Sequence, residues 1–478
     1  MKKIAIIGGG VAGLAAAYRV QEEITRGGAV ECVLFEGAGQ FGGKIATERF
    51  DGFVVERGPD SFISQKPAAI ELCKKLGLGD RLVGTNPNRT KTYVYTGKKL
   101  VTMPDGLSLM IPTQFLPFAL TPLFSLAGKI RMGLDLIIPK KRGRADESLA
   151  SFVRRRMGEE ALQKMAEPML AGIYASDPET MSINSTFPMF VETEQKYRSL
   201  ILGMLARKRQ MLMQKPKTNN HRQPFSLFMT LKNGLGEMVD AVIEKSPDVA
   251  FRANAKVREV ARNGGRWKVI LEDGESVDAD AVIFATPARL AAEFLQPFAP
   301  RAAELLQRIK YVSTATVTFA YRKEGFSHSL NGFGFVVPKT ENRKILACTW
   351  TSSKFPHRTP EGYVMLRCFV GGALQEDLAE QDEETIARMV KKELLDLMRI
   401  DQEPVIAKVF HNKKSNVQYQ VGHAALIDAV DKALTGFPGL YLAGSAYRGI
   451  GIPDCIQNGT QAAESAIECL AEKSPEAV

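Results

Sequence analysis

The sequence predicts an α/β fold, and three observations along the chain support this prediction. Residues 3–35 read as a strand, a glycine turn, a helix and a second strand. Residues 249–285 alternate between apolar and polar side chains around two glycine turns, which predicts short strands. Residues 440–443 are a short apolar run that leads into a glycine-rich segment. We therefore expect a Rossmann-like domain whose pieces lie far apart in the sequence.

Composition and charge set broad limits on the kind of protein. With 478 residues, of which 45% are hydrophobic and 24% charged, the chain can bury a large core and divide into two or three lobes. Its 63 Lys and Arg against 53 Asp and Glu leave a formal net charge of +10. This surplus favours acidic partners, such as phosphates, anionic small molecules or an anionic membrane surface, without choosing among them.

Cysteines and histidines are scattered singly, without the spacing of a metal site or the density of a disulfide scaffold. The cysteines are Cys32, Cys73, Cys348, Cys368, Cys455 and Cys469, and the histidines are His221, His328, His357, His411 and His423. These patterns predict no metal and favour a reduced, cytoplasmic compartment.

The N-terminal residues could be mistaken for a signal peptide, because two lysines precede an apolar run. The glycines argue against this interpretation. Residues 3–7 predict a strand, Gly8 to Gly10 a turn, and residues 11–20 a helix, and the chain then enters a second strand at 31–35 without a small-residue cleavage site.

The glycine spacing predicts a dinucleotide site. In Gly8-x-Gly10-x-x-Gly13, the first glycine permits a tight turn, the second lets the backbone approach a pyrophosphate, and the third lets the helix pack on the strand. The helix N-terminus would then direct its N–H groups at the phosphates. Glu36, at the end of the second strand, is placed to accept hydrogen bonds from a ribose.

A second glycine turn follows Glu36 and ends in a cation, Gly42-Gly43-Lys44. This arrangement resembles the extended fingerprint of the FAD-binding oxidoreductases of the amine oxidase and phytoene desaturase type. The resemblance implies that FAD is the cofactor. Since no second GxGxxG is present, we expect no separate NADPH domain.

Two later regions are expected to return to the same domain. Residues 249–285 predict a small meander with turns at 263–265 and 273–274, and Val257 matches the position whose backbone meets the adenine in the FAD family. Near the C-terminus we expect a last strand at 440–443, a backbone segment at 449–453 beside the flavin, and a closing helix over 455–469.

The apolar segment 105–138 is broken by Pro112, Pro117 and Pro122, which argues against a membrane-spanning helix. Two alternatives remain: short helices that form the wall of an apolar cavity, or a lobe resting on a membrane surface beside Lys140-Lys141-Arg142 and Arg144. A basic run over 195–222 lacks the interleaved aromatics of a single-strand binder, so we expect no nucleic acid.

Four longer stretches resemble the bacterial porphyrinogen oxidases of haem synthesis, of the soluble Gram-positive type. They are ERGPDSFIS (56–64), residues 167–201 with the motif GIYASD, ACTWTSSKFPH (347–357) and GIGIPDCI (449–456). The resemblance covers almost the whole chain. It implies an FAD enzyme that oxidises coproporphyrinogen III to coproporphyrin III with O2 and releases hydrogen peroxide. Protoporphyrinogen IX is the alternative substrate, and an amine oxidase, a carotenoid desaturase or a non-catalytic flavin protein are more distant alternatives.

The resemblance also implies site residues. For FAD these are Gly8, Gly10, Gly13, Glu36, Gly43, Lys44, Gly58, Pro59, Asp60, Ser61, Val257, Gly451, Ile452 and Pro453. Lys66 would anchor a substrate carboxylate, and Tyr174 would line the substrate site. No catalytic side chain is predicted, because the flavin itself accepts the hydride. Where relatives carry a tryptophan near the flavin this chain has Asn412, which leaves open whether Phe410 replaces it or the site is more polar.

The expected organisation has three parts. An FAD-binding domain comprises residues 1–65, 225–300 and 436–478, a mixed-sheet, α+β substrate domain comprises 66–95, 185–224 and 301–435, and a helical lobe comprises 96–184. The expected partners are a porphyrinogen, O2 and a ferrochelatase-type enzyme in transient contact. The expected location is the cytoplasm, with contact to the inner face of the membrane as one alternative.

Overall fold

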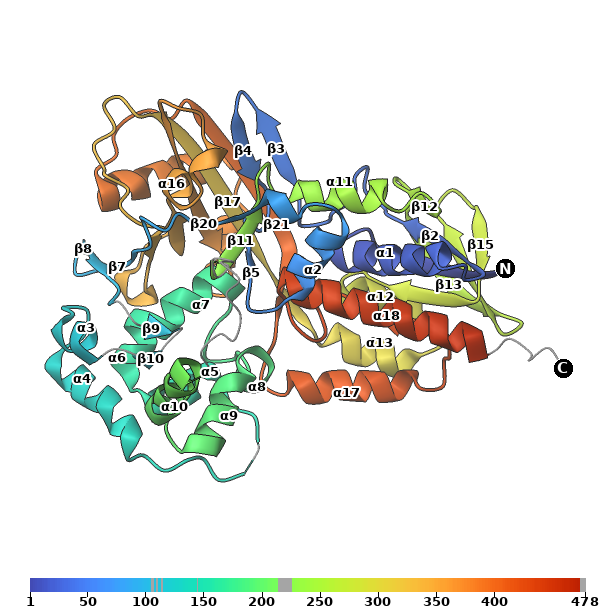
Figure 1. Cartoon of the computed structure of the whole chain (residues 1–478), viewed down its shortest axis with the longest axis horizontal. Coiled ribbons are helices and arrows are strands. Elements are labelled where there is room, and N and C mark those ends of the chain that lie inside the picture. Colours follow the sequence, from blue (N-terminus) through green and yellow to red (C-terminus); the bar gives the residue numbers. More distant parts are fainter. Residues whose placement is uncertain (105–106, 109–110, 113–114, 144, 214–225, 473–478) are drawn as a thin grey trace. The chain divides into compact units, whose positions relative to one another are not determined.

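The computed structural model describes residues 1–104, 107–108, 111–112, 115–143, 145–213 and 226–472, which form two compact units (Figure 1). Unit 1 comprises Met1–Gly84, Phe225–Lys310 and Ala424–Val478, and unit 2 comprises Thr85–Pro224 and Tyr311–His423. The three-part division of the sequence stays a prediction, because two units do not separate a helical lobe from a substrate domain.

Unit 1 is built on a five-stranded parallel sheet with the order β12-β2-β1-β16-β22. Its strands are β1 (Lys2–Ile7), β2 (Val30–Phe35), β12 (Val249–Arg252), β16 (Ala281–Phe284) and β22 (Leu440–Leu442). They are apolar along most of their length because helices cover the sheet, as is typical of parallel sheets. The predicted strands at 3–7, 31–35, 281–285 and 440–443 are confirmed. Residues 249–252 belong to this sheet, so their assignment to the meander was wrong.

The longer helices of unit 1 are α1 (Val11–Thr25), α2 (Ala68–Lys75), α11 (Gly236–Glu244), α12 (Ala288–Leu295), α13 (Pro300–Gln307), α17 (His423–Leu434) and α18 (Ile452–Glu472). Four of them, α1, α2, α11 and α18, share one apolar core with the sheet. Figure 1 shows α1 in blue beside α18 in red, the first and last helices of the chain. The alanines of α1 allow this close packing, because Ala15, Ala16 and Ala17 are all buried.

Three smaller sheets complete unit 1. The predicted meander is confirmed as β13 (Val257–Asn263), β14 (Arg266–Leu271) and β15 (Ser276–Ala279), with its two glycine turns between the strands. A hairpin joins β3 (Thr47–Phe50) to β4 (Phe53–Glu56), and β11 (Phe228–Leu231) lies between β5 (Phe62–Ile63) and β6 (Leu82–Gly84), which follows the short turn η1 (Gly79–Arg81).

Unit 2 contains a seven-stranded mixed sheet with the order β21-β17-β20-β19-β18-β7-β8. Its strands are β7 (Thr92–Thr96), β8 (Lys99–Thr102), β17 (Lys310–Arg322), β18 (Gly334–Val336), β19 (Ala347–Thr349), β20 (Tyr363–Gly371) and β21 (Ile406–Gln418). β18 and β7 pair in parallel, whereas β17, β20 and β19 pair antiparallel. Helix α16 (Glu383–Met398) packs on one face through Ile386, Val390 and Leu394. The short helices here are η4 (Lys339–Glu341), α14 (Thr351–Lys354), η5 (Pro356–Arg358) and α15 (Glu376–Ala379).

The rest of unit 2 is mainly helical and has its own apolar core. Its elements are β9 (Leu107–Ser108), β10 (Ile111–Pro112), α3 (Phe115–Leu120), α4 (Leu126–Gly133), η2 (Leu134–Leu136), α5 (Leu149–Arg156), α6 (Glu159–Ala161), η3 (Leu162–Ala166), α7 (Glu167–Tyr174), α8 (Ile183–Thr186), α9 (Pro188–Tyr197) and α10 (Leu200–Met213). The segment 105–138 contains the short helices α3, which includes Pro117, and α4, which follows Pro122, whereas their role as the wall of an apolar cavity stays a prediction. Arg144, and the basic run beyond residue 213, lie outside the described residues.

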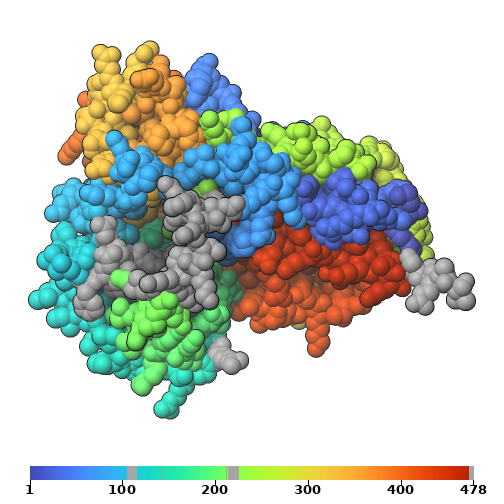
Figure 2. Space-filling model, in the orientation of Figure 1, coloured from blue at the N-terminus to red at the C-terminus, as the bar shows by residue number. Residues whose placement is uncertain are grey.

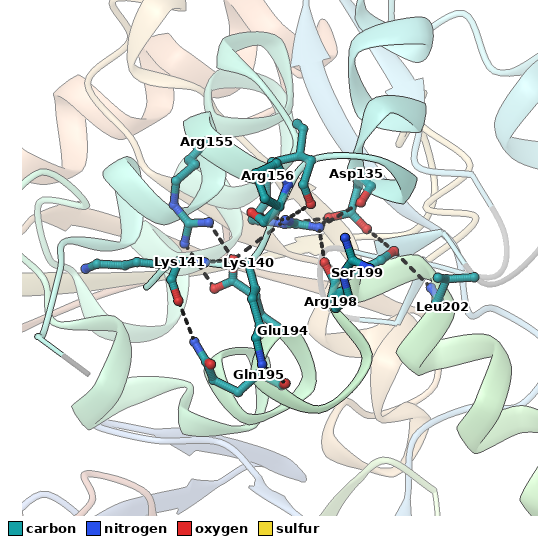
Figure 3. Close-up of polar contacts among 12 residues, drawn as sticks. Asp135, Lys140, Lys141, Arg155, Arg156, Glu194, Gln195, Arg198, Ser199 and Leu202 are labelled. Carbon is teal, nitrogen blue, oxygen red and sulfur yellow. Dashed lines mark hydrogen bonds and ion pairs between the residues drawn. The ribbon is translucent and has the colours of Figure 1, made fainter. Parts of the chain in front are cut away.

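A buried ionic network fastens these helices together (Figure 3). Arg156 and Asp135 are both fully buried, and Arg156 Nε donates to Asp135 Oδ1 at 2.6 Å. Ser199 Oγ donates to the other Asp135 oxygen at 2.6 Å. Glu194, which is also buried, receives Arg155 Nη2 at 3.0 Å and lies 3.6 Å from Arg156 Nη1. The Arg156 guanidinium also donates to the backbone carbonyls of Asp135, Ile138 and Arg198.

Within the part of the chain that the structure describes, no helix is both long enough and apolar enough to cross a membrane. In the same residues no group of three or more His, Cys, Asp and Glu side chains is arranged to hold a metal ion. All six cysteines are free thiols, and five of them are buried.

Candidate cofactor site

The N-terminal glycine turn is packed tightly on its inner side. Gly8 adopts φ +108°, and its N–H donates to the Phe35 carbonyl at 2.8 Å. A Cβ on Gly8 would lie 2.6 Å from the Ala285 carbonyl oxygen, and a Cβ on Gly13 would lie 2.0 Å from the Gly8 carbonyl oxygen. Neither position has room for a side chain, because α1 and β16 approach the turn too closely.

Gly10 faces the opposite way. It is the residue before the first turn of α1, with φ −70° and ψ 174°, and a Cβ added to it would meet no protein atom within 4 Å. The open space lies at the N-terminus of a 15-residue helix, where backbone N–H groups and the helix dipole favour an anion. This position suits one phosphate of a pyrophosphate.

The second glycine turn lies directly against the first. The Gly42 N–H donates to the Gly9 carbonyl at 2.8 Å, and a Cβ on Gly43 would lie 3.1 Å from Gly10 Cα. Lys44 follows and is accessible to solvent. The protein atoms around its ammonium lower its pKa through desolvation, while the nearby Cys455 thiol acts in the opposite direction. A bound anion would favour the charged form of Lys44.

Glu36 is held at the end of β2 by two backbone groups. The Gly9 N–H donates to Glu36 Oε2 at 2.7 Å, and the Ala38 N–H donates to Oε1 at 2.8 Å. The Ala255 N–H donates to the Glu36 carbonyl at 2.8 Å, so the segment that leads into Val257 runs beside Glu36. Val257 itself is buried. The structure thus brings together the residues predicted to meet the ribose and the adenine.

The predicted segment Gly58–Ser61 follows β4 and is anchored by buried Glu56. The Glu56 carboxylate accepts Thr47 Oγ1 at 2.6 Å and the Leu235 N–H at 2.8 Å. A Cβ on Gly58 would lie 1.9 Å from the Lys44 carbonyl oxygen, so the segment passes against the backbone of the second glycine turn. Ser61 Oγ donates to Asp60 Oδ1 at 2.6 Å.

The C-terminal segment joins the same structure through α18. Helix α18 packs against α1, where a Cβ on Gly459 would lie 2.1 Å from the Ala12 carbonyl oxygen. Farther along both helices, Arg19 Nε donates to Glu464 Oε1 at 3.3 Å. Because both residue numbers increase in the same direction, the two helices run parallel. Their N-termini therefore lie at the same end, and α18 begins about one and a half turns ahead of α1.

The start of α18 differs from the prediction. The helix begins at Ile452 rather than Cys455, so Ile452 and Pro453 belong to its first turn. Proline is tolerated there because the first N–H groups of a helix have no partner within it. Gly444 adopts φ +121°, with no protein atom within 4 Å of an added Cβ, and its N–H donates to Asn458 Oδ1 at 2.8 Å.

Lys66, the predicted anchor for a substrate carboxylate, forms an ion pair with a carboxylate of the protein itself. Its ammonium donates to both oxygens of Asp454, at 2.6 and 2.8 Å. Tyr174 belongs to unit 2, where its ring packs edge-on against Phe187 with 5.6 Å between centroids. Both assignments stay predictions.

Asn412 lies in β21 of unit 2, on the same face of the strand as Phe410, since side chains alternate along a strand. Phe410 is buried and Asn412 is partly exposed. Between them, His411 places Nδ1 2.9 Å from the Ala379 carbonyl oxygen.

Three polar residues of the site escaped the sequence analysis. Glu56, Asp454 and Asn458 each hold a glycine segment or a helix start by hydrogen bonds. The sequence contains one indication of the role of Asp454. It follows Gly451 by three residues, the spacing at which an acidic side chain accepts a hydrogen bond from the backbone N–H of the N-cap residue. The partners of Glu56 and Asn458 depend on tertiary contacts that have no local pattern.

The residues fit an extended dinucleotide cofactor. The inner glycines are crowded, whereas a Cβ added to Gly10 or Gly444 would meet no protein atom within 4 Å. The opening at Gly10 lies at the N-terminus of α1, the opening at Gly444 lies beside Asn458 of α18, and Glu36 accepts the N–H of Gly9 in the first glycine turn. FAD has this sequence of parts: adenine, ribose, pyrophosphate, ribityl chain and flavin. We call the set of segments 8–13, 36–44, 58–61 and 444–453 the nucleotide cradle.

Comparison with known proteins gives a consistent result. Residues 11–467 match the family described as flavin containing amine oxidoreductase. The coproporphyrinogen III oxidase of Bacillus subtilis (strain 168) is 38% identical over 98% of this chain and 98% of its own length. The enzyme of that name from Staphylococcus aureus is 32% identical over 98% and 99%. A crystal structure from Exiguobacterium, provisionally described as a protoporphyrinogen oxidase, matches with a TM-score of 0.86 at 32% identity, covering 98% of this chain and 99% of its own.

Proposed function

The chain belongs to the flavin-containing amine oxidoreductases, and from this premise we propose that it is the FAD-dependent oxidase that converts coproporphyrinogen III to coproporphyrin III. The observation that carries the proposal is the 38% identity to the Bacillus subtilis enzyme over nearly the full length of both chains. A match confined to the FAD-binding segments would support only the cofactor. This one extends over both units, including the sheet and helices that must provide the substrate site.

In the proposed reaction, three two-electron steps remove six hydrogen atoms from the porphyrinogen, and three molecules of O2 become hydrogen peroxide. The flavin supplies the acceptor for each hydride. The chain supplies the binding. We assign the pyrophosphate to Gly8, Gly10, Gly13, Gly43 and Lys44, and the adenosine to Glu36 and Val257. The segments Gly58–Ser61 and Gly451–Pro453 are assigned to the ribityl and flavin end.

The cradle also explains why no acid or base is needed near the hydride. The cradle contains many glycines and backbone N–H groups, which can hold and orient a cofactor without titrating. Protons lost from the pyrrole nitrogens can pass to solvent. We therefore expect no single substitution of an ionisable side chain to abolish the chemistry while leaving FAD bound.

The test is anaerobic bleaching of the bound flavin by coproporphyrinogen III and protoporphyrinogen IX, at matched concentrations. Faster bleaching by coproporphyrinogen III supports the proposal. Faster bleaching by protoporphyrinogen IX would overturn the choice of substrate while leaving the reaction type intact. No bleaching by either, in protein that contains FAD, would overturn the porphyrinogen assignment and direct attention to amines.

Protoporphyrinogen IX is the second candidate, and the Exiguobacterium structure is the observation in its favour. The two substrates differ in carboxylates, since coproporphyrinogen III carries four and protoporphyrinogen IX two. The formal charge of +10 favours the more anionic substrate. A steeper fall of activity with added salt for the tetracarboxylate would support a cationic binding site.

O2 as electron acceptor belongs to the same proposal and is tested by the stoichiometry of peroxide to porphyrin, expected to be three to one. A ferrochelatase-type partner is also proposed. Faster metal insertion with the two enzymes together than with premixed free porphyrin would support transfer by contact, and equal rates would exclude it.

We also propose that the helical part of unit 2 contacts an anionic membrane surface. Leu126, Ile130 and Ile137 are 76, 60 and 73% exposed, and they lie on one side of α4 and its continuation. Figure 2 shows this cyan segment at the molecular surface, and Leu116 and Leu120 of α3 are also exposed. A cavity wall would hide such side chains, so their exposure supports the membrane alternative.

Sedimentation with lipid vesicles tests the membrane contact. We expect the protein to bind vesicles that contain phosphatidylglycerol, and the triple replacement of Leu126, Ile130 and Ile137 by serine to abolish this binding. Replacement of the exposed Leu395 on α16 by serine is the control, since it removes a 42% exposed leucine elsewhere in unit 2. Equal binding by all three proteins, or none by the wild type, would contradict the proposal.

A further inference from the structure

The ion pair between Lys66 and Asp454 joins two segments of the proposed cofactor site. Lys66 follows the Gly58–Ser61 segment and β5, whereas Asp454 lies in the first turn of α18. Both hydrogen bonds are short, at 2.6 and 2.8 Å, and the Asp454 side chain is only 15% exposed, against 55% for Lys66. The carboxylate is thus the fixed partner, and the lysine reaches over to it from the surface.

Asp454 also fixes the backbone of the glycine segment that precedes α18. Its Oδ2 accepts the Gly451 N–H at 3.3 Å, which gives it the role of the acidic residue in a capping box. A Cβ on Gly449 would lie 2.5 Å from Asp454 Cγ, so the chain wraps closely around this carboxylate. The Cys455 N–H donates to the Gly451 carbonyl at 2.9 Å and continues the turn into the helix.

These contacts give one side chain three tasks at the same place. Asp454 shapes Gly449 to Gly451, begins α18, and binds the ammonium of Lys66. A lysine whose ammonium already has a bidentate carboxylate is poorly suited to capture a second one, because the substrate would have to displace Asp454. The geometry therefore argues against Lys66 as an independent anchor for a propionate.

We propose that Asp454 and Lys66 form a positioning pair that sets the electrostatic field at the flavin end of the cradle. The inference rests on the proposed FAD site and does not depend on which porphyrinogen is oxidised. In the pair the two charges offset each other, and the N-terminus of α18 remains the main source of positive potential there. Reduced flavin is more negative than oxidised flavin, so its stability depends on this balance.

The proposal predicts opposite changes for the two single variants. Lys66→Met leaves the Asp454 charge uncompensated and makes the flavin harder to reduce, whereas Asp454→Asn leaves the Lys66 charge and makes it easier. We expect each to change the ratio of reduced to oxidised flavin at fixed potential by up to about tenfold, which is about 30 mV for a two-electron couple. The double variant should return close to the wild type.

The experiment measures the midpoint potential and the dissociation constant of FAD in the holoprotein of each variant. In Asp454→Asn the new side-chain amide keeps an oxygen for the Gly451 N–H, so the start of the helix is retained. Lys75→Met is the matched control, because Lys75 binds Glu22 at 2.8 Å with side-chain exposures of 53 and 18%, close to those of the Lys66 pair. We expect no change in flavin potential for this control.

Opposite shifts in the single variants, and their cancellation in the double variant, would support the proposal. Equal potentials in all four proteins, with a rise in KM for Lys66→Met alone, would overturn it and restore Lys66 as a substrate anchor. Shifts of the same sign in both single variants would also overturn it, since they indicate general distortion. A wild type that binds no FAD would instead refute the proposed cofactor site.

Discussion

The nucleotide cradle of unit 1 and the buried ionic network of unit 2 use polar groups in opposite ways. In the cradle, backbone groups and glycines leave open space at Gly10 and Gly444. In the network, Arg156, Asp135 and Glu194 fill the interior with charged side chains. A ligand site is therefore recognised by space next to the backbone that no protein atom fills. A structural site is recognised by polar side chains that all have partners within the protein.

Substitutions in the two regions are also expected to differ in their effect on the free energy of unfolding. Removing one member of the network leaves its partner charged in a dry interior, which is costly even before any ligand is considered. A side chain added at Gly10, where φ is −70° and no protein atom lies within 4 Å, costs little until the cofactor arrives. The protein contains two tryptophans, buried Trp267 in unit 1 and buried Trp350 in unit 2. In a variant that retains only one tryptophan, the fluorescence reports on the unit that contains it.

The largest effect is expected from Arg156→Met. The substitution leaves the buried Asp135 carboxylate without its guanidinium, and we expect the free energy of unfolding of unit 2 to fall by about 3–5 kcal/mol. Urea unfolding followed by Trp350 fluorescence in a Trp267→Phe background measures this change.

The control for this variant is Arg154→Met, which changes a residue two positions before Arg156 on the same helix, α5. Arg154 is paired with Glu159 and Glu179, but its side chain is 41% exposed. Exposed pairs contribute about 0–1 kcal/mol, so a loss equal to that of Arg156→Met would contradict the importance of burial.

Gly13→Ala should destabilise unit 1 without any cofactor present. Its new Cβ would lie 2.0 Å from the Gly8 carbonyl oxygen, and the backbone must shift to make room. We expect a loss of about 1–3 kcal/mol, as for other overpacked positions. Urea unfolding of the apoprotein, followed by Trp267 fluorescence in a Trp350→Phe background, tests this; an unchanged midpoint would show that the turn is loosely packed.

Glu167→Gln tests a buried acid of unit 2 that lies outside the ionic network, so its behaviour can be compared with that of Asp135 and Glu194 inside the network. Burial raises its pKa to about 7, although the Lys339 N–H that it accepts acts in the opposite direction. The folded protein therefore binds a proton that the unfolded chain releases near pH 4.3, and stability should fall as the pH rises from about 4.5 to 7. This part of the loss is on the order of 3 kcal/mol or less.

The difference in unfolding free energy between wild type and Glu167→Gln isolates that part, since other titrating groups are common to both proteins. We expect the variant to lose less stability than the wild type over this pH range. Parallel profiles for the two proteins would mean that Glu167 ionises in the folded state as it does in the unfolded chain.

Gly10→Ala should have the smallest effect on stability and a large effect on the cofactor. No protein atom lies within 4 Å of the new Cβ, and φ −70° suits alanine, so the apoprotein should unfold within about 0.5 kcal/mol of the wild type. The methyl group would occupy the space assigned to the pyrophosphate, and FAD affinity should fall by at least about tenfold. Equilibrium titration of the apoprotein with FAD measures it, and unchanged affinity would place the phosphates elsewhere.

The cradle was largely predictable because glycine spacing records backbone geometry directly. Gly8, Gly10, Gly13 and Glu36 come together as expected, and the three strands of the meander and four of the five parallel strands were correctly predicted, the exception being β12. The start of α18 was missed because Pro453 was interpreted as a residue outside the helix. Its position in the first turn depends on Asp454, whose capping role is visible only once the helix start is known.

The side-chain contacts could not be predicted in the same way. Lys66 and Asp454 are 388 residues apart, and nothing near either residue indicates the other. Arg156 and Asp135 are 21 residues apart, on elements whose packing the sequence does not specify. Lys140 was interpreted as part of a surface cation cluster and is exposed, and its ammonium donates to the Gln195 carbonyl at 3.1 Å, a partner that the sequence does not indicate. The sequence shows which charged residues need partners, but the partners themselves are known only from the folded structure.

The parallel packing of α1 and α18 also has a consequence for the order of synthesis. Arg19 and Glu464 touch across this contact although 445 residues separate them. At about 5–20 residues per second, the ribosome needs roughly 20 to 90 seconds between them. For that time the side of α1 that packs on α18, which includes Ala12 and Arg19, has no final partner. The nascent chain must therefore be kept from aggregating, and the cofactor can settle in its site only after α18 has left the ribosome.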